Sequence, residues 1–209
     1  GRGQEWQRQL AWDREIAQDW AGHAHSYLAA ALQGLPGLQL QEESKQNDHK
    51  LSYYTPLQSD RTSLTAAINS RLAALGVSAS LIWSVDEPLG SGLLDILPAR
   101  ASKFHALEAL MKLHGCDYSN TVFCGDSGND IEVLASPIPA VLVANAQAEV
   151  CEQARRLAGE MGHEAELYIA RGDFMAMNGN YSAGMLEGIA HYHPDTLQWM
   201  GFETSGSES

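Results

Sequence analysis

The chain has 209 residues, of which 44% are hydrophobic, so it is long and apolar enough to fold around a sizeable core. Thirteen Lys and Arg residues stand against 26 Asp and Glu residues, which gives a formal net charge of −13. Nucleic acids and anionic membranes attract clustered Lys and Arg, so this charge argues against both as the main partner.

The sequence also bears on where the protein works. Its apolar stretches are shorter than a membrane span, and its first residues lack a basic-then-apolar signal pattern, so we expect a soluble protein. The three Cys residues form no CxxC pair, which favours reduced thiols in the cytoplasm over a disulfide framework.

The first 97 residues predict helices and a small, mainly antiparallel sheet. Apolar residues recur at three- and four-residue steps from Trp6 to Ala31, which indicates one helix, or two because Asp13 breaks the stripe and Gly22 weakens it. Short strands are predicted near Leu38–Leu40 and Leu51–Tyr53, and two more over Ser80–Val85 and Gly92–Leu97. Between the two pairs, a helix is predicted from about Asp60, capped by Ser59 or Asp60 and ended by Gly76. Helices packed on one face of such a sheet would satisfy this order.

From Pro98 onward, helices and apolar strands alternate. Helices are predicted at about Lys103–His114, from about Asn129, over Gln147–Leu157 and at about Ala183–His191, and strands over Thr121–Cys124, Ile138–Val143 and Leu167–Ala170. This alternation indicates a parallel sheet with crossover helices, and therefore an α/β fold. We expect the Ser-rich end over 204–209 to be disordered.

The most informative run is TVFCGDSGNDIEVL at 121–134. Its apolar strand delivers Asp126 to the carboxyl end, where open parallel sheets place their ligands. Asp130 follows four residues later, so both carboxylates can face one crevice and offer the hard oxygen ligands that Mg2+ prefers. The alternative is that Asn129 and Asp130 only cap the next helix.

Lys103 is the second candidate. It opens a predicted helix, where exposed amide groups favour an anion and where a Lys would complete a phosphate site. Lys103 and Asp126 are 23 positions apart, and the segment between them holds one helix and one strand, which would bring both side chains to the same edge of the sheet. The alternative is a solvated surface cation.

Several motifs together resemble the haloacid dehalogenase superfamily. Lys103, GDSGND at 125–130 and VANAQ at 143–147 resemble its motifs III and IV and the loop that follows them. HKLSY at 49–53, LDILP at 94–98 and AGMLEGIAH at 183–191 are more narrowly similar to sucrose-phosphate phosphatases, over roughly residues 6–191. The resemblance implies an α+β cap domain over 1–97, the carboxyl-terminal half of a Rossmann-like phosphatase core over 98–192, and a largely disordered tail over 193–209.

This resemblance implies a Mg2+-dependent phosphatase that acts through a phosphoaspartate on a sugar phosphate, with sucrose 6-phosphate as the expected substrate. In that scheme Lys103 stabilises the phosphoryl group, Asp126 binds Mg2+, and Asp130 binds the ion or orients one of its waters. Asn129 is expected to hold the carboxylates by hydrogen bonds. Asn145 is a candidate for supporting the site or contacting the substrate, with an ordinary turn Asn as the alternative.

The cap is expected to select the sugar. Lys50, Tyr53 and Tyr54 lie on a predicted cap strand and are candidates for sugar contact. Because side chains alternate along a strand, the two tyrosines point to opposite faces, and at least one of them should pack in the core.

One feature of the superfamily is absent from the sequence. Asp-x-Asp, whose first Asp attacks phosphorus in such enzymes, occurs nowhere in the 209 residues. We therefore expect a fragment that lacks motifs I and II and is inactive alone. The alternative is a non-catalytic phosphatase-like domain of a sucrose-phosphate synthase, which would make a fused or adjacent synthase the partner. The presence of Lys103, Asp126 and Asp130 favours the phosphatase.

Overall fold

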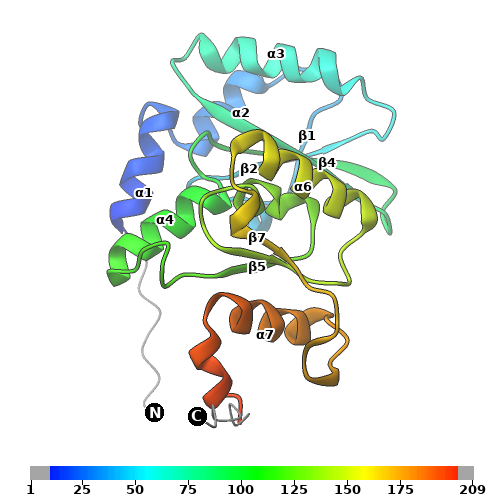
Figure 1. Ribbon diagram of the computed structural model, residues 1–209. Helices are drawn as coiled ribbons and strands as arrows, with labels where there is room; N and C mark the ends of the chain where they lie inside the picture. Colours follow the sequence, from blue (N-terminus) through cyan, green and yellow to red (C-terminus); the bar gives the residue numbers. More distant parts are fainter. Residues whose placement is uncertain (1–9, 202–209) are drawn as a thin grey trace, which may run out of the picture. The chain divides into compact units, whose positions relative to one another are not determined.

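The computed structural model describes residues 10–201 and divides the chain into two compact units, Gly1–His105 and Ala106–Ser209 (Figure 1). Trp6 and the Ser-rich end over 204–209 lie outside the described residues. The limit predicted for the cap domain, residue 97, falls within the last strand of the first unit. No helix within residues 10–201 is both long and apolar enough to cross a lipid bilayer.

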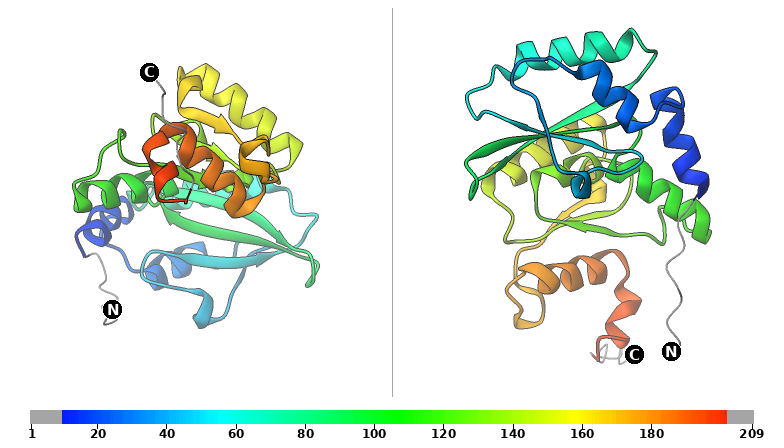
Figure 2. Two further views of the ribbon diagram at one scale, coloured as in Figure 1. Left: turned by 60° about the horizontal axis from the view of Figure 1, so that its bottom comes forward. Right: turned by 180° about the vertical axis from the view of Figure 1, so that it is seen from behind.

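The first unit is an antiparallel sheet with helices on one face. Its elements are α1 (Leu10–Ala17), η1 (Gln18–Trp20), α2 (His25–Leu32), β1 (Gln39–Leu40), η2 (Glu43–Lys45), β2 (Leu51–Thr55), α3 (Arg61–Ala73), β3 (Ala79–Asp86), β4 (Ser91–Pro98) and the start of α4 (Lys103–His114). The sheet order is β1-β2-β4-β3, and every neighbouring pair is antiparallel. Helices α2 and α3 cover the same face (Figures 1 and 2). This confirms the predicted arrangement.

Local sequence explains the helix ends in this unit. The first helical stretch is divided at Gly22, whose φ of 76° suits glycine, so two helices form rather than one. Of the two candidate caps for α3, Asp60 is the one used, because its Oδ1 accepts from the backbone N–H groups of Thr62 and Ser63, each at 3.1 Å.

The core of the first unit lies between the helices and the sheet. Its buried members come from α2, α3, β2 and β4 together with Trp20 and Val77, namely Leu28, Leu32, Leu51, Tyr53, Leu64, Ile68, Leu72, Leu94 and Ile96. Burial alternates along β4, as one-sided packing requires.

The second unit is a parallel sheet with helices on both faces. Its elements after α4 are β5 (Phe123–Gly125), η3 (Gly128–Asp130), α5 (Ile131–Leu134), β6 (Ala140–Leu142), α6 (Ala148–Met161), η4 (Glu164–Glu166), β7 (Leu167–Ile169), η5 (Phe174–Ala176), α7 (Tyr181–Tyr192) and η6 (Pro194–Gln198). The order is β5-β6-β7, with both pairs parallel. Helices α5 and α6 pack on one face and α7 on the other (Figure 1). The predicted α/β fold is confirmed.

Two glycines explain how closely α7 approaches the sheet. A Cβ on Gly188 would overlap the side chain of Val141 on β6, and a Cβ on Gly184 would lie 2.9 Å from Val143 Cγ1. The AGMLEGIAH run therefore places small residues where the helix meets the strand.

The tail predicted over 193–209 contains one short helical element in its described part. Pro194–Gln198 forms η6, which begins with Pro at its first position and is stabilised by the hydroxyl of Thr196, which donates to His193 O at 2.7 Å. Residues 202–209 lie outside the described part of the chain.

Candidate functional site

The loop after β5 carries the two predicted metal-binding carboxylates. Asp130 is 5% exposed, and its Oδ2 accepts from the backbone N–H groups of Asp126 and Ser127, each at 3.1 Å, and lies 2.9 Å from Ser127 Oγ. Ser127 and Asp130 thereby form a reciprocal capping box at the start of η3. Asp130 Oδ2 thus takes part in capping η3, and the carboxylate also fixes the backbone that carries Asp126. A metal-binding role for Asp130 stays a prediction.

Gly125 makes room for this carboxylate. A Cβ at position 125 would lie 2.7 Å from Asp130 Oδ2 and 2.8 Å from its Cγ, which is closer than side chains tolerate. The Gly that precedes Asp126 is therefore required by the approach of Asp130 and by nothing in the strand itself.

Asn129 belongs to the same network. Its Oδ1 lies 2.5 Å from Ser127 Oγ, and the single hydroxyl proton of Ser127 can be donated to Asn129 or to Asp130 at any one time. Asn129 is thus linked to Asp130 through Ser127, and its expected hydrogen bonding to the carboxylates stays a prediction.

Asn145 lies beside Asp126, just after β6. Its Nδ2 donates to Asp126 Oδ2 at 3.4 Å, and its Oδ1 accepts from the backbone N–H of Tyr181 at 2.7 Å. Tyr181 begins α7 with a φ of 47°, a left-handed conformation that non-glycine residues rarely adopt. Asn145 is therefore a supporting residue of the Asp126 loop, and its contact with substrate stays a prediction.

The donor set of this loop suits a hard cation. As metal ligands, Asp126 and Asp130 offer carboxylate oxygens, and the side-chain amide of Asn129 offers its carbonyl oxygen. Within residues 10–201 no three His, Cys, Asp or Glu side chains gather into a metal-binding group. Mg2+ commonly takes one or two carboxylates and completes its shell with water and phosphate, so two carboxylates on one loop fit that ion.

Lys103 is the first residue of α4, where the sequence placed it. It belongs to the unit that ends at His105, whereas Asp126 belongs to the other unit. The meeting of Lys103 and Asp126 at one site therefore stays a prediction.

Lys50 lies beside a pocket of the first unit. Its Nζ forms an ion pair with Asp95 Oδ2 at 3.3 Å, and Asp95 Oδ1 also accepts from the hydroxyl of Ser52 at 2.6 Å. The pocket has a volume of about 610 Å³ and is lined by Trp12, Asp13, Ile16, Asn47, Asp48, His49, Lys50, Leu97 and Ala101. Lys50 is thus placed where a small polar molecule could reach it.

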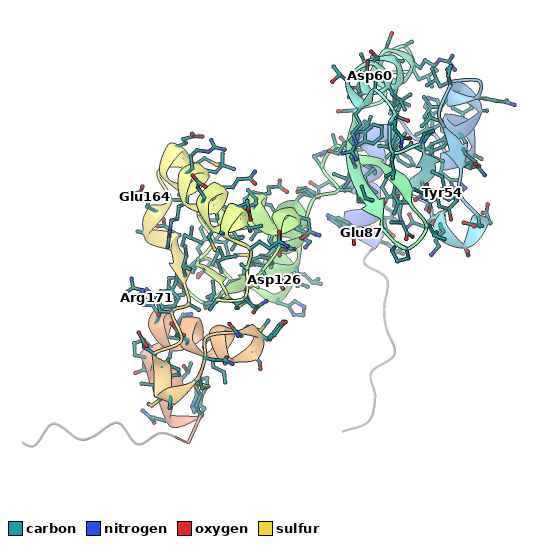
Figure 3. All side chains as sticks on the ribbon, turned by 90° about the vertical axis from the view of Figure 1, so that its right-hand side faces the viewer. Tyr54, Asp60, Glu87, Asp126, Glu164 and Arg171 are labelled. Atoms are coloured by element: carbon teal, nitrogen blue, oxygen red, sulfur yellow. The ribbon has the colours of Figure 1, made fainter. Side chains whose placement is uncertain are left out.

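The two tyrosines of β2 point to different surroundings. Tyr53 is 4% exposed and packs in the core of the first unit, and burial raises the pKa of its hydroxyl to about 12. Tyr54 is half-buried, and its hydroxyl donates to Glu42 Oε2 at 2.9 Å (Figure 3). The prediction that at least one tyrosine packs is confirmed for Tyr53, which leaves Tyr54 as the candidate for sugar contact.

Sequence reasoning missed Glu187. This residue of α7 is 4% exposed, and its carboxylate accepts from Tyr168 Oη at 2.8 Å and from the N–H groups of Arg171 and Gly172 at 2.7 and 3.1 Å. Burial by itself raises the pKa of Glu187, but these hydrogen bonds outweigh it and leave the pKa lowered. The available signal was a single Glu on the apolar face of a helix.

Comparison with other sequences identifies the family of the chain. The family model for sucrose-6F-phosphate phosphohydrolase matches residues 2–193. A protein of Nitrosococcus oceani that carries the name HAD-like hydrolase is 52% identical over 206 residues, which are 98% of this chain and 54% of that protein. Sucrose-phosphatase 1 of Nicotiana tabacum is 36% identical over 146 residues, 68% of this chain and 30% of that protein. The chain thus spans about half, or less, of the length of these relatives.

Solved structures share the fold. The sucrose-phosphatase from Synechocystis sp. PCC6803, solved in complex with sucrose and phosphate, matches with a TM-score of 0.60 and 26% identity over 88% of this chain and 66% of that one. A haloacid dehalogenase-like hydrolase protein from Bacillus subtilis matches at 18% identity with a TM-score of 0.51, which shows the fold alone. Since the family model extends over nearly the whole chain, the chain belongs to the sucrose-6F-phosphate phosphohydrolase family of haloacid dehalogenase-like phosphatases.

Proposed function

We propose that this chain supplies the cap and the metal-binding part of a Mg2+-dependent phosphatase that converts sucrose 6-phosphate to sucrose. The observation that carries the proposal is the Asp126 loop, in which Asp130 and Asn145 hold a carboxylate at the end of a parallel strand. The family and the relative solved with sucrose and phosphate support the choice of substrate.

Each residue has a physical task in this proposal. Mg2+, when bound, neutralises charge on the phosphoryl oxygens. Asp126 holds the ion, and Asp130 keeps the Asp126 backbone in place through its hydrogen bond. Lys103 adds a positive charge that favours the transition state over the ground state. The 209 residues contain no Asp-x-Asp, so the proposal assigns the nucleophile to no residue of this chain.

The pocket beside Lys50 is the proposed sugar site. A sugar needs polar groups that exchange hydrogen bonds with its hydroxyls and an apolar surface for its ring faces. Asn47, Asp48 and Lys50 offer the first, and Trp12 offers the second. Lys50 is already oriented by Asp95, so it can donate to a hydroxyl with little loss of side-chain freedom.

Phosphate release by the full-length gene product tests this proposal. We expect sucrose 6-phosphate to be hydrolysed in preference to glucose 6-phosphate and fructose 6-phosphate, with Lys103→Ala reducing turnover about 100-fold. Lys50→Ala should raise KM, and Lys45→Ala, which removes a cation from the same unit outside the pocket, should not. Sugar-phosphate binding without any phosphate release would instead favour the non-catalytic domain of a synthase.

A further inference from the structure

We propose that a pocket beside β7 binds the phosphate ester of a small hydroxylated molecule, at a site separate from the Asp126 loop. The β7-edge pocket has a volume of about 470 Å³ and is lined by Arg155, Ala158, Glu164, Leu167, Tyr168, Ile169, Ala170 and Arg171. This volume lies within the range of small-molecule sites. The inference does not depend on the proposed phosphatase function.

The position of the pocket separates it from the candidate metal site. Among the described strands of the second unit, β7 is an outer strand, and β6 lies between it and β5, whose end carries Asp126. Figure 3 shows Glu164 and Arg171 apart from Asp126 within this unit. A ligand in the β7-edge pocket would therefore not touch the Asp126 carboxylate.

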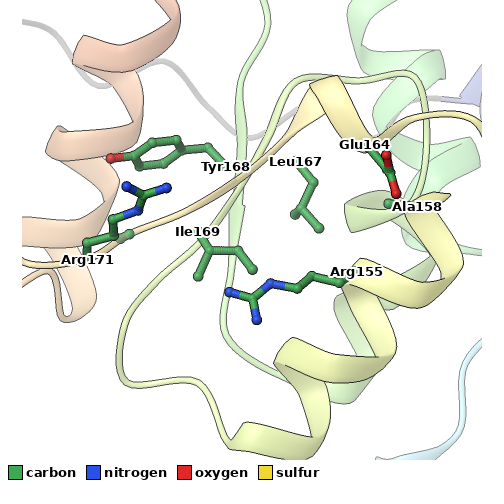
Figure 4. Close-up of a pocket in the computed structure, with 8 residues that line it drawn as sticks. Arg155, Ala158, Glu164, Leu167, Tyr168, Ile169 and Arg171 are labelled. Carbon is green, nitrogen blue, oxygen red and sulfur yellow. The ribbon is translucent and has the colours of Figure 1, made fainter.

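Two arginines supply the positive charge of the pocket. Arg155 comes from the middle of α6, and Arg171 lies two residues after the end of β7 (Figure 4). The backbone N–H of Arg171 donates to Glu187 Oε1 at 2.7 Å. In the described part of the chain, neither guanidinium takes part in an ion pair or a side-chain hydrogen bond. Arg156, the next residue of α6, does form an ion pair, with Glu160 at 2.8 Å.

An anion is the ligand that this arrangement selects. Arg155 and Arg171 line the same pocket, and a guanidinium group there can donate charge-assisted, bidentate hydrogen bonds to a phosphate group. The chain as a whole is acidic, with a formal net charge of −13, so a pocket lined by two arginines is a local exception. The carboxylate of Glu187 accepts three hydrogen bonds, none of them from the Arg171 guanidinium, which acts on Glu187 through its charge alone.

Glu164 favours, among anionic ligands, a phosphate ester that also carries hydroxyl groups. Its side chain folds over Gly159 of α6, where an added Cβ would lie 2.7 Å from its Oε1. A carboxylate held there repels a second phosphate and accepts hydrogen bonds from hydroxyls. A ligand with a phosphate at one end and hydroxyls at the other, as in a sugar phosphate, satisfies both ends of the pocket.

Titration of the chain with glucose 6-phosphate tests the inference. Amide NMR shifts of Ile169–Gly172 should move saturably, in buffer without Mg2+. Arg155→Ala and Arg171→Ala should each weaken the apparent Kd about tenfold, because each removes a charge-assisted contact. Arg156→Ala, the matched control with the same loss of charge on the same helix, should change it less than about twofold.

Further arms identify the chemistry and the site. Glucose should not bind, and inorganic phosphate should bind more weakly than the ester while depending on the same two arginines. Glu164→Gln should weaken the ester and leave inorganic phosphate unchanged. Lys103→Ala should leave the shifts of Ile169–Gly172 intact, since Lys103 lines no part of this pocket.

The inference is overturned if the Ile169–Gly172 amides do not respond, if glucose binds as well as its phosphate, or if Arg156→Ala weakens binding as much as Arg155→Ala. Binding that disappears in Lys103→Ala would also overturn it, by moving the site to the phosphatase centre. Arg171→Lys keeps the charge and the backbone N–H that Glu187 holds, so it separates loss of binding from loss of the fold.

Discussion

Asn145 connects Asp126 to the start of α7. Its Oδ1 accepts from Tyr181 N–H at 2.7 Å, and its Nδ2 donates to Asp126 Oδ2 at 3.4 Å. Because the oxygen is engaged by the shorter bond, the NH2 group faces Asp126, and the hydrogen-bond network thereby fixes the amide orientation. The orientation of the carboxylate thus depends on a helix that is distant in sequence.

Replacing Asn145 should weaken metal use by the phosphatase. Asn145→Ala removes the donor to Asp126, and loss of a group that orients a metal ligand costs about tenfold or more in metal affinity. We expect the apparent Mg2+ affinity, measured from phosphate release against Mg2+ concentration, to fall about tenfold. Tyr181→Ala keeps the backbone N–H that Asn145 accepts and should leave that affinity within about twofold. An equal loss in both variants would contradict the role given to Asn145.

Gly125 can be tested against a glycine of the same loop. Gly125→Ala places a Cβ 2.7 Å from Asp130 Oδ2, so the carboxylate must move and its bonds to the backbone weaken. The free energy of unfolding, measured by urea denaturation, should fall by about 2 kcal/mol. Gly128→Ala meets nothing within 4 Å and should change it by less than about 0.5 kcal/mol. Similar values for the two variants would show that Asp130 is not tightly held.

Glu187 should make the stability of the second unit depend on pH. Its lowered pKa means that the folded state binds a proton less readily than the unfolded state, whose pKa is near the ordinary value of 4.5. The stabilisation is therefore present above that value and is lost as the pH falls through the pKa of the folded state. Glu187→Gln should lower the free energy of unfolding by about 2 kcal/mol at neutral pH.

The free energies of unfolding of the wild type and of Glu187→Gln should differ less at acidic pH. The gap between wild type and Glu187→Gln should shrink between about pH 7 and about pH 3.5 in urea denaturation. Glu160→Gln alters an exposed pair with Arg156 and serves as the control, with an effect below about 0.5 kcal/mol. A gap that stays constant with pH would contradict the lowered pKa.

Substitution of Tyr53 can distinguish a role in core packing from a role in contacting the sugar. Its buried hydroxyl has no hydrogen-bond partner among the described residues, so Tyr53→Phe removes an unsatisfied polar group. We expect the free energy of unfolding to rise by about 1 kcal/mol and KM for the sugar phosphate to stay unchanged. Tyr54→Phe, which loses an exposed bond to Glu42, should not raise the stability. A raised KM in Tyr53→Phe would restore this residue to the sugar site.

Much of the fold could be predicted because the local patterns agree with the tertiary structure. The change from an antiparallel meander to alternating helices and strands is visible in the apolar spacing, and Asp60 and Gly22 mark helix ends by their own chemistry. The placement of Asp126 directly after a strand of a parallel sheet could be predicted for the same reason, and such a position is where ligands commonly bind.

The remaining features depend on contacts between distant segments. The partners of Glu187 are Tyr168 and the backbone after β7, so its role requires the packing of α7 against that strand. The strand period showed that Tyr53 and Tyr54 face opposite ways, but the side that is buried depends on where α2 and α3 pack. The orientation of Asn145 likewise depends on its hydrogen bond with the backbone of Tyr181, which is 36 residues away.

The most direct test of the central claim is Mg2+-dependent phosphate release from sucrose 6-phosphate by the full-length gene product and its Asp126→Asn variant, after metal removal with EDTA. The Asn side chain keeps the size of Asp126 and loses the charge that holds the ion. We predict that added Mg2+ restores turnover in the wild type, and that the variant stays about 100-fold lower at saturating Mg2+ while retaining its fold. Turnover in Asp126→Asn within about twofold of the wild type would contradict the assignment of the Asp126 loop as the metal site.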